Sequence, residues 1–286
     1  MGTPALSMLW EADDPAEQLT RRFGFAGADA VAAWVAEVLE RDWELDVTGC
    51  ERVVISSWNV MAWLHVGERR LIAKWSALPH RFPRLRDAAQ VVRWLDGHGI
   101  PVATPIPAVD GRVLVELANG RNGRLRSRLP LPGGRFLFGV LPVLDGDLLD
   151  VGDLSQVADA GRMLSAVHEA LASCPHPVGN KGPAGQEQLI HNDFRSANVL
   201  HDGTRITAVL DLEEVTYGTR VADLARAAVL LGTRYRAWRP AGEAVREAFV
   251  AAYDDCAEIP LTAADREEFD RLVAENLKQK WWASPI

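Results

Sequence analysis

The chain has 286 residues, of which 48% are hydrophobic and 24% are charged. This is the composition of a globular protein, and it excludes a wholly disordered chain. Acidic residues outnumber basic ones, 39 to 31, which gives a formal net charge of −8. A net negative protein is a poor candidate for general binding to nucleic acids or anionic membranes, because both require a basic surface.

Cysteine usage and the N-terminal sequence indicate a cytoplasmic protein. Cys50, Cys174 and Cys256 are odd in number and widely spaced, which excludes a disulfide framework and a cysteine-only zinc site. The first residues lack the basic and apolar regions of a signal peptide. No run reaches the roughly 18 apolar residues that a membrane helix needs, so we expect no membrane partner.

The first half of the chain predicts helices followed by an antiparallel sheet. Hydrophobic residues recur at helical spacing within residues 15–45, and a helix is expected over residues 84–97. Short runs rich in β-branched and aromatic residues predict strands, with a tight turn at Gly67 and Glu68. The runs are residues 51–56, 59–66, 69–76, 112–117 and 135–144.

The second half predicts mainly helices around short central strands. Residues 153–172 place apolar side chains on one helical stripe, and so does the tail from Phe269 to Trp281. The change from sheet to helix predicts two lobes that join near residues 141–146. The expected segments are residues 1–46, 47–140 and 141–286.

A polar loop between two apolar strands carries the residues that are best suited to chemistry. It contains His191, Asp193 and Asn198, and the following strand leads to Asp211. Phosphoryl transfer needs such a set, because one carboxylate accepts the proton of an attacking hydroxyl while other oxygens hold Mg²⁺ against phosphates. Arg195 would place a cation against the transferring phosphoryl group.

The spacing His-x-Asp-x₄-Asn with a following aspartate is similar to the catalytic loop of protein-kinase-like enzymes. The sequence resembles the aminoglycoside phosphotransferase family, which includes choline and ethanolamine kinases. The segment Asp223-Leu224-Ala225, twelve residues after Asp211, matches the family. Residues 164–171 resemble its Leu-His helix and residues 136–150 its linker strand.

The resemblance covers about residues 47–283 and implies an α+β, bilobal protein-kinase-like fold. It implies a nucleotide-binding lobe over residues 47–140 and a helical lobe with the catalytic loop and the acceptor site over residues 141–286; the helical segment expected over residues 1–46 precedes it. The bonds of an adenine would involve the backbone near Leu141 and Val143, because Pro142 has no N–H to donate.

By the same resemblance, Asp193 is the catalytic base, and Asn198 and Asp211 hold Mg²⁺. Glu213 would be a further ligand of the metal, directly or through water, and His191 would support the loop structurally. The resemblance gives Asp223 a structural role as well. Asn192 stands where glycine is more common, which is the form seen in choline-kinase-like members.

The resemblance also assigns nucleotide-binding residues to the first lobe. Lys74 would grip the α- and β-phosphates of ATP; the alternative is a lysine on the exposed face of an edge strand. The turn at residues 56–59 stands where a glycine-rich loop covers the phosphates, and Ser57 and Asn59 offer a hydroxyl and an amide. Asp87 would pair with Lys74; alternatively it stabilises the N-terminus of its helix through the dipole.

The distribution of charge predicts a cationic acceptor. Residues 1–140 contain 16 acidic and 17 basic residues, whereas residues 141–286 contain 23 and 14. Carboxylates bind ammonium groups, and tryptophan faces attract quaternary ammonium. The candidate acceptor contacts are Glu214, Asp254, Asp255, Glu258 and Trp281. The alternatives are solvated loop acids and a core tryptophan.

These patterns predict a kinase that transfers the γ-phosphate of ATP, or of GTP, with Mg²⁺ to a hydroxyl of a small molecule. A cationic antibiotic of the aminoglycoside or basic peptide type is the favoured substrate, with resistance as the consequence. The alternatives are a metabolic kinase for choline, ethanolamine, homoserine or a sugar, and a catalytically weak binding protein of kinase fold.

A nucleic-acid binder is a third alternative, built on a basic run in the first half of the chain. The run consists of Arg121, Arg124, Arg126 and Arg128. It is short and stands in a chain of net negative charge, so a solvated hairpin is favoured. We expect no nucleic-acid partner, and a monomer or a weak dimer.

Overall fold

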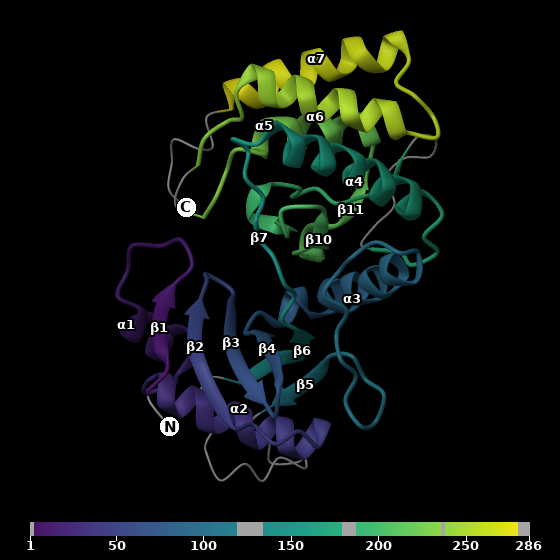
Figure 1. The fold of residues 1–286 in the computed structure, drawn as a ribbon. Coiled ribbons are helices and arrows are strands. Elements are labelled where there is room, and N and C mark those ends of the chain that lie inside the picture. The colour runs from purple at the N-terminus through teal and green to yellow at the C-terminus, as the bar shows by residue number, and fades with distance from the viewer. Residues whose placement is uncertain (1–2, 119–133, 179–186, 236–237, 280–286) are drawn as a thin grey trace. The chain divides into compact units, whose positions relative to one another are not determined.

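A computed structural model describes residues 3–118, 134–178, 187–235 and 238–279. The chain forms two compact units and passes between them three times: within one helix, between Ala103 and Thr104, and after a strand. Figure 1 shows the arrangement of the elements within each unit. The first unit comprises Met1–Arg86 and Thr104–Val143, and the second comprises Asp87–Ala103 and Leu144–Ile286. The predicted α+β class is confirmed, since strands dominate the first unit and helices the second.

The first unit contains a sheet of six strands in the order β1-β2-β3-β4-β6-β5 (Figure 1). The strands are β1 (Ala5–Met8), β2 (Gly49–Ile55), β3 (Asn59–Val66), β4 (Arg69–Ser76), β5 (Val115–Ala118) and β6 (Arg135–Pro142). The predicted antiparallel meander of β2, β3 and β4 is present. Gly67 has φ 59°, which suits the tight turn between β3 and β4.

Strand β1 is the part of this sheet that the sequence did not predict. It has four residues and pairs parallel with β2 at the edge of the sheet, with Met8 opposite Ile55. The helical pieces that follow it are α1 (Pro15–Gln18), a π-helix (Leu19–Phe23) and α2 (Ala28–Trp43). Residues 1–46 therefore contribute a strand as well as helices to the first unit.

Helix α2 packs its apolar stripe against the sheet through an aromatic cluster. Trp34 lies 5.2 Å from Trp75 of β4 and 5.6 Å from Phe138 of β6, measured between ring centroids. Both contacts are edge-to-face, a geometry worth about 0.5–1.5 kcal/mol beyond the burial itself. Because Ala73 and Trp75 face this core, Lys74 between them points to the opposite face of β4.

Four long helices belong to the second unit: α4 (Leu154–Ala172), α5 (Arg220–Leu230), α6 (Glu243–Cys256) and α7 (Ala263–Lys278). Helix α3 (Phe82–Gly97) begins in the first unit and ends in the second. Helices α4 and α6 approach closely at Gly161, where a Cβ atom would lie 2.2 Å from the Phe249 carbonyl oxygen. Only glycine allows this approach without a shift of the backbone.

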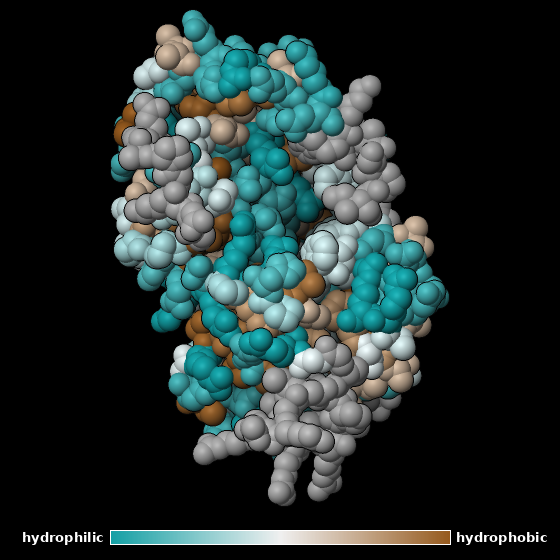
Figure 2. Space-filling model, turned by 180° about the vertical axis from the view of Figure 1, so that it is seen from behind, coloured by the Kyte–Doolittle hydropathy of each residue, from teal (hydrophilic) through white to brown (hydrophobic). Residues whose placement is uncertain are grey.

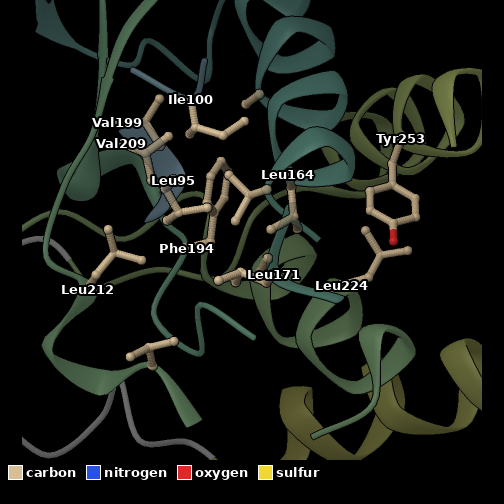
Figure 3. Packing of buried hydrophobic residues seen from close by; sticks show 14 of the residues in the cluster. Leu95, Ile100, Leu164, Leu171, Phe194, Val199, Val209, Leu212, Leu224 and Tyr253 are labelled. Atoms are coloured by element: carbon tan, nitrogen blue, oxygen red, sulfur yellow. The ribbon is translucent and has the colours of Figure 1, made fainter. Parts of the chain in front are cut away.

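Short strands in the second unit frame a loop. Strands β10 (Ile206–Val209), β9 (Val199–His201) and β7 (Asp147–Leu148) form one small sheet, and β11 (Thr216–Gly218) pairs with β8 (Gln188–Ile190) in another. The segment between β8 and β9 is the predicted catalytic loop. Phe194 of this loop is buried in the core beside Leu164 and Leu171 of α4 (Figure 3), which anchors the loop.

Among the described residues, no helix is both long enough and apolar enough to cross a membrane. On the face drawn in Figure 2, hydrophilic residues predominate and hydrophobic ones gather in small groups.

Candidate active site

The backbone of the loop takes an uncommon conformation at Asn192, with φ 64°. Residues other than glycine seldom enter this left-handed region, but asparagine does so more readily than most. Its side-chain Nδ2 donates to the carbonyl of Glu214 at 3.2 Å. Asparagine can therefore stand where the resembling family more often has glycine.

The carboxylate of Asp223 on α5 binds backbone N–H groups of the loop between β8 and β9. Its Oδ1 accepts the N–H of Asn192 at 2.9 Å, and its Oδ2 accepts the N–H of His191 at 3.0 Å. Burial alone would raise the pKa of Asp223, but the hydrogen bond and charge of His168 and the backbone N–H of Asn192 hold that pKa below its ordinary value. An ionised carboxylate at the start of α5 thus fixes the loop.

The ring of His191 bridges the loop to the end of strand β10. Its Nε2 lies 3.1 Å from the carbonyl of Leu210, and its Nδ1 accepts the backbone N–H of Asp193 at 3.2 Å. This pair of bonds requires the neutral ring with the proton on Nε2. The ring therefore fixes the backbone at Asp193 relative to the end of β10.

Asp193 is the carboxylate that the loop presents. Its Oδ2 accepts hydrogen bonds from Asn198 Nδ2 at 2.8 Å and from Arg195 Nε at 3.1 Å, and its side chain is 21% exposed. Burial raises the pKa of Asp193; Arg195 opposes this rise, and the charge of Asp211 adds to it. A raised pKa makes this carboxylate a stronger base than an ordinary aspartate.

Arg195 is buried beside Asp193 and is only partly satisfied. Its side chain is 7% exposed, its Nη1 is buried without a hydrogen-bond partner in the described part of the chain, and its guanidinium lies 5.4 Å from the centre of the Trp238 ring. A buried donor without a partner is costly. An anion delivered to the loop would supply the missing acceptor.

Asn198 and Asp211 offer oxygen atoms that suit a hard cation. The Asn198 Nδ2 donates to the carbonyl and to Oδ2 of Asp193, which leaves the amide oxygen available as a ligand. Asp211 is exposed and has φ 58°, a strained conformation that functional sites often contain. It is joined to Asn198 through Leu210, whose N–H donates to the Asn198 carbonyl at 2.8 Å.

The oxygen atoms of Asn198 and Asp211 suit an Mg²⁺ ion whose other ligands come from a bound substrate and water. The described residues contain no group of three or more His, Cys, Asp or Glu side chains that would form a closed metal site. Mg²⁺ commonly takes one or two protein ligands and completes its shell with phosphates and water. Asn198 and Asp211 are the residues that would hold it. Glu213 follows in the short 3₁₀-helix Leu212–Glu214 and is partly buried.

In the first unit, Lys74 lies on a strand with neighbours on both sides. It stands opposite Met61 of β3 and Gly139 of β6, so the alternative of an edge strand is wrong. Leu141 pairs with Ile72 in the same ladder. Asn59 closes the turn after β2, where its carbonyl accepts the N–H of Ser56 at 2.8 Å.

Two groups that were expected to face a nucleotide have partners within the protein. The hydroxyl of Ser57 donates to Glu11 Oε1 at 2.7 Å. The N–H of Val143 donates to the carbonyl of Arg70 at 3.1 Å, which extends the β4–β6 ladder beyond Pro142. Neither proton is available to a nucleotide in this arrangement.

Comparison with known proteins agrees with this geometry. Residues 176–268, which contain the loop and Asp223, match the sequence model of the phosphotransferase enzyme family. This match covers less than half of the chain and agrees with the predicted family, which the motif at residues 191–198 had indicated. No curated protein sequence matches the chain significantly.

The chain has the fold of solved small-molecule kinases. A microcompartment-associated aminopropanol kinase has a TM-score of 0.62 and 17% identity, and the match covers 86% of this chain and 87% of that one. An amicoumacin kinase complex with AMP-PNP, Ca²⁺ and amicoumacin scores 0.55 at 12% identity, with coverage of 87% and 93%. A spectinomycin phosphotransferase complex with ADP and spectinomycin scores 0.52 at 11% identity, covering 87% of each chain.

The residues expected to bind the acceptor lie in different surroundings. Glu214 follows Glu213 in the 3₁₀-helix after Asp211 and is partly buried. Asp254 links α6 to α7, because its Oδ1 accepts the N–H of Leu261 at 2.6 Å and its Oδ2 forms an ion pair with Arg266. The structure thus gives the Asp254 carboxylate a structural role.

The remaining expected residues stay predictions. Asp255 and Glu258 are exposed near the end of α6, and the N–H of Glu258 donates to Glu169 Oε1 at 2.9 Å. Asp87 belongs to the second unit and Lys74 to the first. Trp281 and the basic run from Arg121 to Arg128 lie outside the described residues.

Three residues that support the loop were not assigned from the sequence. His168 of α4 places Nε2 at 2.9 Å from Asp223 Oδ2 and Nδ1 at 2.9 Å from the hydroxyl of Tyr253 on α6. Arg226 Nε donates to the carbonyl of Asn192 at 2.8 Å. The histidine in the Leu-His segment was visible in the sequence, whereas Tyr253 and Arg226 carried no local signal.

Proposed function

We propose that this protein is an ATP-dependent kinase that phosphorylates a hydroxyl of a cationic small molecule. The observation that carries the proposal is the arrangement at Asp193, a carboxylate with raised pKa that is oriented by Asn198 and Arg195. A general base of this kind needs a fixed position and a pKa nearer to the working pH than that of an exposed aspartate.

Asp193 Oδ2 already accepts two hydrogen bonds, so Oδ1 is the oxygen that would receive the proton of the acceptor. The acceptor hydroxyl oxygen forms a bond to the γ-phosphorus, and the bond between that phosphorus and the bridging oxygen of ADP breaks. The hydroxyl proton passes to Asp193, and the electron pair of the broken bond leaves on ADP.

Arg195 is proposed to stabilise the transferring phosphoryl group. Its unpartnered Nη1 is a buried cationic donor beside the base, and a phosphoryl oxygen would satisfy it. Mg²⁺, when bound to Asn198 and Asp211 with Glu213 as a further direct or water-mediated ligand, would neutralise charge on the phosphates.

The first unit is proposed to supply the nucleotide contacts. Lys74 points away from the aromatic core on an interior strand, which is where a single cation for phosphates would be rigidly held. Asp87 is proposed as its partner. Leu141 and the carbonyl of Val143 would face the adenine, since the Val143 N–H is donated to Arg70.

The acceptor is proposed to be an amine-bearing antibiotic. The acidic excess of residues 141–286 favours a cation, and Glu214, Asp255 and Glu258 are the carboxylates that would bind it. Two of the solved structures with this fold are complexes with amicoumacin and spectinomycin, and another is named for aminopropanol. An amino alcohol is therefore the second candidate.

A substrate panel tests this proposal. Purified protein with Mg²⁺ and ATP, or GTP in parallel, is incubated with aminoglycosides, basic peptide antibiotics, choline, ethanolamine, homoserine and sugars. The measurements are ADP formation and the gain of one phosphate by mass spectrometry. The proposal predicts acceptor-stimulated turnover with a cationic compound. Nucleotide binding without any phosphorylated product would favour the alternative of a kinase-fold binding protein.

A further inference from the structure

The turn between β2 and β3, residues 56–59, contains no glycine and is closed by internal hydrogen bonds. The N–H of Ser56 donates to the Asn59 carbonyl at 2.8 Å, and the N–H of Asn59 donates to Ser56 Oγ at 3.0 Å. Trp58 at its tip is 47% exposed. A turn without glycine has little freedom to rearrange around a phosphate, so it must hold its working shape in advance.

The N-terminal segment runs directly to this turn. Strand β1 pairs with β2 up to Met8 opposite Ile55, and the N–H of Leu9 continues the ladder by donating to the Ile55 carbonyl at 2.8 Å. The π-helix that follows is anchored by Leu19 and Phe23, both buried in the core of the first unit. Glu11, which follows β1, and Arg22 of the π-helix are thereby placed next to the turn.

These two residues bond to the turn and to each other. Glu11 Oε1 accepts the hydroxyl of Ser57 at 2.7 Å and Arg22 Nη1 at 3.0 Å. The same Arg22 nitrogen reaches the Ser56 carbonyl at 3.4 Å. The Glu11 side chain is only 8% exposed, so its charge is largely removed from water and depends on the arginine.

The hydrogen bond to Glu11 uses the one proton that the Ser57 hydroxyl can donate. A serine hydroxyl has one proton, and phosphate oxygens accept hydrogen bonds but cannot donate them unless they are protonated. The Ser57 proton is directed to Glu11. Ser57 thus bonds to the N-terminal segment, and the backbone of the turn remains to face a nucleotide.

We propose that Glu11 and Arg22 are positioning residues that hold the turn at residues 56–59 in its nucleotide-binding shape. The inference rests on the proposed use of a nucleotide by the first unit. By this proposal the N-terminal segment increases the affinity for the nucleotide, and the loop that contains Asp193 carries out the chemical step.

Nucleotide affinity in matched variants tests this assignment. The dissociation constant of a Mg²⁺-bound, non-hydrolysable ATP analogue is measured by calorimetry, beside the thermal midpoint, for the wild type, Glu11→Gln, Glu11→Ala, Ser57→Ala and the double variant. Glu11→Ala should weaken binding about tenfold, the effect of one hydrogen bond to a charged group. Glu17→Gln, an exposed helix acid, should bind like the wild type.

The double variant separates a positioning role from a direct contact. If Ser57 acts only through Glu11, the variant with both changes should bind no more weakly than Glu11→Ala alone. Additive losses would instead show that Ser57 contacts the nucleotide itself, and this would overturn the inference. Glu11→Gln and Ser57→Ala test the same bond if Glu11→Ala does not fold.

The remaining outcomes distinguish the inference from the proposed function. Unchanged or tighter binding by Glu11→Ala, with the wild type binding normally, would overturn the positioning role alone. Failure of the wild type to bind any nucleotide would overturn the proposed function and the inference with it. In the expected case, kcat at saturating nucleotide stays near that of the wild type while the nucleotide KM rises.

Discussion

The Nε2 atom of His168 lies 2.9 Å from Oδ2 of Asp223, and both side chains are buried. Asp223 also accepts the backbone N–H groups of His191 and Asn192, so the pair joins helices α4 and α5 to the loop between β8 and β9. Tyr253 extends the chain of contacts to α6 through its hydroxyl. Burial raises the pKa of this tyrosine to about 12, which keeps the hydroxyl protonated.

Removal of the Asp223 carboxylate should strongly destabilise the second unit. Asp223→Ala leaves two backbone N–H groups and a histidine donor buried without acceptors, and the expected loss is about 3–5 kcal/mol in the free energy of unfolding. Urea denaturation measures it. Glu267→Gln, an exposed acid on α7, is the control and should change stability by less than about 0.5 kcal/mol. Equal stability of both variants would contradict the role of Asp223.

The contribution of Asp223 to stability should depend on pH. Its pKa is held below the ordinary value of 3.8 in the folded protein, so the unfolded chain binds its proton first as the pH falls. The stabilisation is fully present above the unfolded pKa and is lost as the pH falls through the folded pKa. The stability gap between the wild type and Asp223→Asn, followed by chemical denaturation from pH 7 to the lowest pH at which both fold, should therefore narrow below pH 4. A gap that widens would mean the pKa is raised.

The pH at which activity is lost on the acid side of the pH–rate profile should be higher than the pKa of an ordinary aspartate. Burial and the charge of Asp211 raise the pKa of Asp193, and the base must be ionised to accept a proton. Activity should thus fall with decreasing pH at a value above 3.8, the ordinary pKa of the side chain. The measurement is kcat/KM against pH with a substrate that does not titrate in this range. Loss of activity only at or below the ordinary pKa of aspartate would contradict a raised pKa of Asp193.

Substitution of Gly161 should loosen the packing of α4 against α6. Gly161→Ala gains helix propensity of about 1 kcal/mol, but its Cβ would lie 2.2 Å from the Phe249 carbonyl oxygen. Separation of the helices should outweigh the gain and lower the free energy of unfolding by about 1–3 kcal/mol. The neighbouring Arg162→Ala, at an exposed position of the same helix, should have a much smaller effect. A more stable Gly161→Ala would show that the helices have room to adjust.

The fold was predictable where local patterns are strong. Runs rich in β-branched and aromatic residues predicted strands β3 and β4 with their observed bounds, and helical periodicity predicted α4 to within one residue. The strands on either side of the polar loop were expected, but β1, β7 and β11 were missed, because four residues or fewer carry too little periodicity. Their positions depend on pairing partners that are distant in sequence.

The sequence predicts the residues proposed to react or bind metal in the candidate site, but it does not predict the residues that support them. The loop spacing predicts roles for Asp193 and Asn198, because a single short segment carries both. The supporting contacts join distant parts of the chain: His168 and Tyr253 are 85 residues apart, and Glu11 and Ser57 are 46 apart. Such contacts are created by tertiary packing and leave no pattern in the local sequence.

The most direct test of the proposed chemistry compares wild type and Asp193→Asn in acceptor-stimulated ADP formation. Asparagine keeps the size of the side chain but cannot accept the proton, so the rate should fall by a factor on the order of 10²–10⁴. Nucleotide affinity should stay close to that of the wild type, and circular dichroism should confirm the fold. Turnover of Asp193→Asn at the wild-type rate, with the same phosphorylated product, would contradict the assignment of Asp193 as the base.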